Sequence, residues 1–97
     1  MSLTAEQLSN LRREVGEGRE IQALLSNEVI QRALNGALHG LQNAWLTERN
    51  AGNREQLWQR AAGLQEFIGA LQTIVDTGKF AEHTLAAEAA INGEKDD

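Results

Sequence analysis

The two histidines are the side chains of this 97-residue chain best suited to metal binding or acid–base chemistry, since imidazole titrates near neutral pH. His39 and His83 lie far apart, and neither belongs to a ligand-spaced motif such as HExxH. Glu82 adjoins His83, but consecutive helical residues point in different directions. The sequence therefore predicts surface histidines, with no metal site and no cofactor.

Thr77-Gly78-Lys79 matches the end of a phosphate-binding loop only in part. No glycine lies five residues before Gly78, and Phe80 stands where a serine or threonine would contact magnesium. A glycine that ends a helix in the left-handed conformation accounts for the triplet. We therefore expect Gly78 to be a helix C-cap.

Acidic and basic side chains alternate near the N-terminus. They are Arg12, Arg13, Glu14, Glu17, Arg19 and Glu20. This pattern is typical of a solvated helix face rather than of paired catalytic acids. It also lacks the basic stripe that displaces counterions from nucleic-acid phosphate. We expect a protein that is no enzyme and does not bind nucleic acid.

Composition favours one small all-α domain, with 41% hydrophobic and 24% charged residues, no proline, four aromatic residues and few β-branched ones. There is no cysteine, no apolar run near the roughly 20 residues of a membrane span, and no signal-peptide pattern. The net charge is −5, of which residues 80–97 carry −4. We expect a single helical domain over residues 1–91, a mobile acidic tail over residues 92–97, no membrane contact and a cytoplasmic location.

Capping signals divide the first half of the chain into two helices. Thr4-Ala5-Glu6-Gln7 forms a capping box for the first helix, which Gly16 and Gly18 are expected to kink or fray. Ser26 or Asn27 caps a second helix that runs to about residue 50. Its apolar stripe follows helical spacing through Ile30, Leu34, Leu38, Leu41 and Trp45.

The turn formers of residues 50–53 predict a reversal, with Asn53 capping a third helix. That helix carries an apolar seam: Leu57, Ala61, Leu64, Ile68, Leu71 and Val75. It is expected to end at Gly78, and residues 80–91 to form a short C-terminal helix. The predicted architecture is an antiparallel αα-hairpin with an extra N-terminal helix and a short C-terminal one, placing Trp45 opposite Trp58 and Leu41 near Ala62.

Two interior glycines of the second helix need explanation, because each costs a helix roughly 1 kcal/mol relative to alanine. A strip of small residues adjoins the apolar stripe: Val29, Ala33, Gly36, Gly40 and Ala44. Such a strip lets another backbone approach closely. Trp58 lies off its own helix's seam, where it contacts the first helix, meets a subunit or stays exposed. The predicted interface of a homo-oligomeric bundle is Ala33, Gly36, Gly40, Ala44 and Trp58.

An ordered set of residues resembles a family of small helical proteins encoded by tailed bacteriophages and prophages. The matching positions, within residues 11–81, are Gly18-Arg19, Leu24-Leu25-x-Asn27-Glu28, Ala44-Trp45, Leu57, Leu64, Phe67, Leu71, Val75 and Thr77-Gly78-Lys79-Phe80-Ala81. The resemblance implies a phage protein encoded among head or packaging genes, present in the bacterial cytoplasm or the virion, with other phage proteins as partners. It brings no catalytic residues, and Gly36 and Gly40 are not part of it.

Two other classes stay open. A small terminase-like subunit, which packages or regulates DNA, requires a helix-turn-helix with basic residues on its second helix, where only Arg32 is available. A secreted helical hairpin of the Trp-x-Gly type matches the length, but Trp45-Leu46-Thr47 lacks its glycine.

Overall fold

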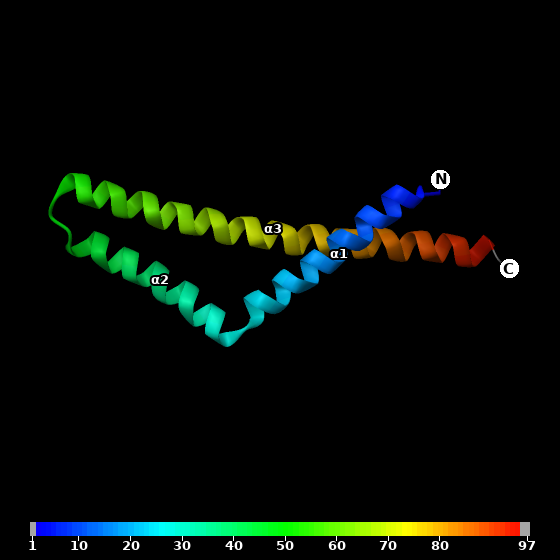
Figure 1. The fold of residues 1–97 in the computed structure, drawn as a ribbon, viewed down its shortest axis with the longest axis horizontal. Helices are drawn as coiled ribbons and strands as arrows, with labels where there is room; N and C mark the ends of the chain where they lie inside the picture. The colour runs from blue at the N-terminus through cyan, green and yellow to red at the C-terminus, as the bar shows by residue number, and fades with distance from the viewer. Residues whose placement is uncertain (1, 96–97) are drawn as a thin grey trace. The chain divides into compact units, whose positions relative to one another are not determined.

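The structure, a computed structural model, describes residues 2–95, with the backbone alone for residues 93–95. Helices α1 (Ala5–Ser26), α2 (Glu28–Thr47) and α3 (Ala51–Lys95) make up this part of the chain, which contains no strand (Figure 1). The predicted all-α class is confirmed. The chain divides into two compact units: a crossing unit, Met1–Ala23 with Gln72–Asp97, and a reversal unit, Leu24–Leu71.

Local capping chemistry fixes the starts of the first two helices. The Thr4 amide donates to Gln7 Oε1 at 2.8 Å, and the Gln7 amide donates to Thr4 Oγ1 at 3.1 Å, which confirms the capping box. Asn27 Oδ1 accepts from the amides of Val29 and Ile30 at 2.9 and 3.1 Å. Asn27, rather than Ser26, is therefore the cap of α2.

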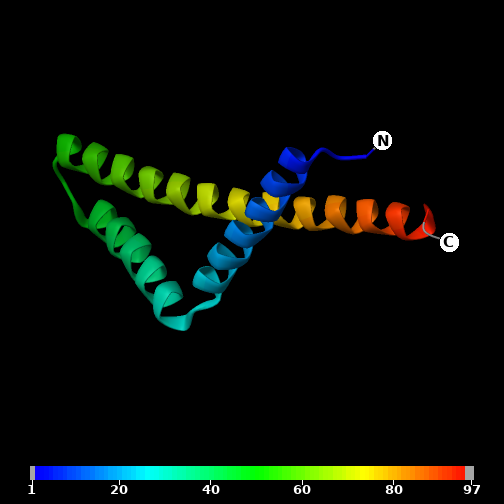
Figure 2. The ribbon, with the colours of Figure 1, turned by 45° about the vertical axis from the view of Figure 1, so that its right-hand side comes forward.

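The linker between α2 and α3 lies about three residues earlier than predicted, because α2 ends at Thr47 rather than near residue 50, and the predicted cap at Asn53 is wrong. Asn50 Oδ1 accepts from the Asn53 amide at 3.0 Å, and the Asn50 amide donates to Glu48 Oε1 at 3.0 Å. Because Asn50 supplies the cap, α3 begins at Ala51 and the linker spans only residues 48–50. The chain reverses direction there, as Figures 1 and 2 show.

Gly78 does not end a helix. α3 continues from Ala51 to Lys95, and no residue in the part of the chain that the structure describes has a positive φ, so the predicted left-handed C-cap is wrong. Residues 80–91, expected to form a separate short helix, are helical but belong to α3. Residues 92–95 of the expected tail also belong to α3, whereas Asp96 and Asp97 lie outside the described residues. Likewise, α1 continues through Gly16 and Gly18 without interruption.

The buried core lies where α1 crosses the second half of α3 (Figures 1 and 2). Gly18, Val75, Gly78 and Ala81 are buried there. A Cβ on Gly18 would lie 2.9 Å from the Cα of Gly78, and one on Gly78 would lie 2.9 Å from the Glu14 carbonyl oxygen. The missing side chains thus allow two backbones to touch, and this contact offsets the low helix propensity of both glycines.

Within Leu24–Leu71, all of which the structure describes, no residue is buried. The apolar stripe of α2 and the seam of α3 are only partly covered. Several large apolar side chains are exposed there: Leu24, Val29, Leu46, Trp58 and Phe67. The reversal unit therefore has the amphipathic pattern of a packed helical pair without an enclosed core.

Candidate interaction surface

An apolar groove lies between the end of α2 and the start of α3, within the reversal unit. Its volume is about 470 Å³, and two tryptophans, three leucines, two alanines and two glutamines line it. Leu41 and Trp45 are one turn apart on α2, and Leu57 and Ala61 are one turn apart on α3. Because residues four apart share a helix face, each helix turns one apolar pair toward the groove. Size and lining are typical of a site for an apolar group.

The guanidinium group of Arg54 lies over the ring of Trp45. The guanidinium carbon of Arg54 lies 4.3 Å from the centroid of the Trp45 ring, within cation–π range. Arg54 Nε is covered and has no hydrogen-bond partner among the described residues. This stack was not predicted from the sequence. Its signal was an arginine and a tryptophan placed on either side of a tight reversal.

Trp58 is the most accessible large aromatic of the groove. It lines the groove beside Ala62 and Gln65, yet 58% of its surface stays exposed. Leu46, on the opposite helix, also lines the groove and is 70% exposed. Within one chain Trp58 is thus an exposed groove residue, and its role in an interface between subunits stays a prediction.

The small-residue strip of α2 is open in the single chain. Ala33, Gly36 and Gly40 are exposed and Ala44 is half-buried. A Cβ added to Gly36 or Gly40 would meet no atom within 4 Å. No backbone of this chain uses that strip for close approach, and its use by a second copy stays a prediction.

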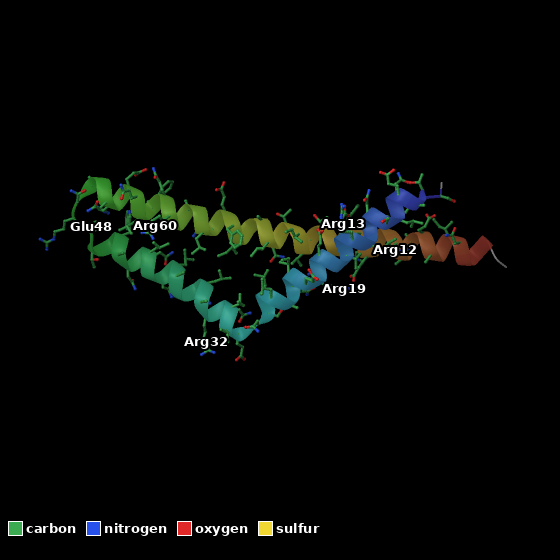
Figure 3. The ribbon with its side chains drawn as sticks, viewed as in Figure 1. Arg12, Arg13, Arg19, Arg32, Glu48 and Arg60 are labelled. Atoms are coloured by element: carbon green, nitrogen blue, oxygen red, sulfur yellow. The ribbon has the colours of Figure 1, made fainter. Side chains whose placement is uncertain are left out.

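Two of the three arginines of α1 pair with acids. Figure 3 labels Arg12, Arg13 and Arg19 along this helix. Arg13 Nε lies 3.8 Å from Glu17 Oε1, and Arg19 Nε donates to Glu82 Oε1 at 2.8 Å. On α2, Arg32 is the single basic residue. These pairs reduce the positive charge that a phosphate backbone would meet.

The side chains that could bind a metal ion or transfer protons do not cluster among the described residues. His39 and His83 are both exposed. Among the residues that the structure describes, no group of three histidine, aspartate or glutamate side chains is placed to hold a metal ion. None of the three described helices contains an apolar stretch long enough to cross a membrane. The groove is therefore the feature of the described residues most suited to binding.

Comparisons with protein-family models, with curated proteins and with solved structures give no match for this chain. The resemblance to a phage family stays a prediction. The groove, the exposed Trp58 and the partly covered apolar stripe are the structural features that bear on function.

Proposed function

We infer that this chain is a non-catalytic helical protein that acts through protein–protein interaction and self-associates through the reversal unit. The observation that carries the inference is the absence of any buried residue within Leu24–Leu71, a fully described segment with large exposed apolar side chains. At roughly 25 cal/mol per Å², covering the exposed surface of Trp58 alone contributes on the order of 3 kcal/mol.

The size of the reversal unit supports the same inference. So short a segment seldom supplies enough core to hold its own fold, and disulfides, metals or oligomerisation usually compensate. The chain has no cysteine, and no metal-binding cluster occurs among the residues that the structure describes. A protein surface is the remaining source of stabilisation.

The biological setting is proposed from the resemblance to small phage and prophage proteins. In that setting the chain is an assembly component that works in the cytoplasm of the bacterial host or within the virion. Its partners are then further copies of itself and other phage proteins. The near balance of charge in residues 1–79, at −1, suits contact with proteins better than contact with nucleic acid.

Two measurements test this proposal. Sedimentation equilibrium should give a mass that is a multiple of the 10.6 kDa chain mass. A strict monomer at high micromolar concentration would refute self-association. Mass spectrometry of purified virions should detect peptides of the chain, whereas peptides found only in lysed host cells would argue against a virion component.

A further inference from the structure

We propose that two copies of the chain pack groove to groove about a two-fold axis, and that the Trp58 side chain of each copy anchors the contact. This proposal rests on the proposed self-association and names its surface. The occupant of the groove is thus the same surface of a second copy.

The rim of the groove suits an identical partner. The polar residues that line the groove are Gln42 and Gln65, which carry no charge. An adjoining pocket that shares Trp58 is lined by Arg54 and Glu55, whose charges are opposite. In a two-fold interface each patch meets the same patch of the other copy, so a rim with charges of one sign repels its own copy. Carboxamides both donate and accept hydrogen bonds, and two such groups therefore pair with each other. Neither the two glutamines nor the opposite charges of Arg54 and Glu55 give this surface a net charge that would repel a second copy.

The groove alone is smaller than the interface of a stable dimer, so the proposed contact extends beyond it. A typical interface buries about 800 Å² per partner and involves roughly 20–30 residues on each side. The groove has only nine lining residues, so the contact must continue along the partly covered apolar stripe. Leu34, Leu38, Leu64 and Ile68 stay partly exposed along that direction. Two copies then form a four-helix arrangement from α2 and the first part of α3.

Trp58 has a matched control within the same helix. Phe67 is 57% exposed, almost the same fraction as Trp58 at 58%. The two residues are nine positions apart, which at about 100° per residue places them on opposite sides of α3. Phe67 is not among the residues that line the groove. Truncating either residue removes a similar exposed aromatic, but only Trp58 belongs to the proposed contact.

The first experiment compares Trp58→Ala with Phe67→Ala by sedimentation equilibrium over a range of concentrations. Truncating an interface anchor weakens association by roughly 30-fold per copy, and hence Trp58→Ala should weaken a symmetric dimer by several hundred-fold. Phe67→Ala should leave association unchanged. Circular dichroism should show the same helix content in both variants. Equal association of Trp58→Ala and the unsubstituted chain would overturn the proposal.

A second pair of variants keeps the test valid if Trp58→Ala loses its fold. Gln65→Glu places like charges on the rim of both copies, whereas Gln56→Glu adds the same charge on the opposite side of α3, nine residues away. Both glutamines are exposed, so neither change disturbs packing within the chain. Gln65→Glu should weaken association several-fold at low salt, and high salt should restore it. Equal effects of the two variants would overturn the proposal.

The outcomes distinguish self-association in general from association through the groove. A monomeric unsubstituted chain refutes self-association and the groove contact together. An unsubstituted dimer that tolerates Trp58→Ala and Gln65→Glu refutes the groove contact alone, and self-association then occurs through another surface. A dimer that both substitutions weaken, with both controls unaffected, supports the two-fold groove contact.

Discussion

The crossing unit and the reversal unit both place glycines inside helices, but only the crossing unit brings them into contact. Gly18 and Gly78 lie against each other's backbones, and Val75 and Ala81 are buried beside them. In the reversal unit, Gly36 and Gly40 face open space. An interior glycine therefore indicates close approach only when a second backbone is available. One copy supplies that backbone in the crossing unit and does not supply it along α2.

The largest expected effect tests the glycine contact of the crossing unit. Gly18→Ala or Gly78→Ala places a Cβ 2.9 Å from backbone atoms of the other helix, so α1 and α3 must separate. We expect each change to lower the free energy of unfolding by about 1–3 kcal/mol, as measured by urea titration. Gly16→Ala is the control, because its Cβ meets nothing within 4 Å, and it should stabilise α1 by up to about 1 kcal/mol. The same gain in Gly18→Ala would disprove the contact.

A second prediction sharpens the contrast at the glycines of α2. In dilute solution, Gly36→Ala with Gly40→Ala should raise the free energy of unfolding by up to about 2 kcal/mol, because alanine is the better helix former and space is available. If a second copy packs on this strip, the same double substitution should weaken association at high concentration. Urea titration and sedimentation of the same variant give the two answers. A loss of stability in the dilute chain would show that the strip is covered within one copy.

The smallest of these effects concerns the aromatic stack at the reversal. Arg54→Ala removes the cation over Trp45 and should lower the free energy of unfolding by about 1 kcal/mol. The emission of Trp45 should also change in a Trp58→Phe background. Arg60→Ala, an exposed arginine of the same helix, is the control (Figure 3). If Arg54→Ala and Arg60→Ala behave alike, the stack contributes nothing to stability.

Local features of the sequence were sufficient to predict the starts of α1 and α2, but not the start of α3. The Thr4 and Asn27 caps depend on residues two or three positions away; Thr4 was predicted, and Asn27 was one of two candidates beside Ser26. Leu41 and Ala62 both line the groove, but the linker lies at residues 48–50, so the register predicted from a reversal near residue 51 is displaced. Asn50 and Asn53 carry the same capping group, so their side chains alone did not identify the one that begins α3.

The role of Gly78 could not be predicted locally. Thr77-Gly78-Lys79 has the composition of a helix end, and only contact with Gly18, sixty positions earlier, shows why the helix continues. Gly36 and Gly40, four residues apart in one helix, were predicted to admit a second backbone, yet a Cβ at either position would meet no atom within 4 Å. Spacing along one helix identifies a narrow face but does not indicate which backbone lies against it.

We propose that a single copy of the chain completes the crossing unit, whereas the reversal unit is completed by a second copy. Hydrogen exchange measured by mass spectrometry at increasing protein concentration tests it directly. Amides of α2 and of the first part of α3, up to Leu71, should gain protection as concentration rises, while amides around Gly18 and Gly78 should keep the same protection throughout. Protection of α2 that is independent of concentration would contradict the account.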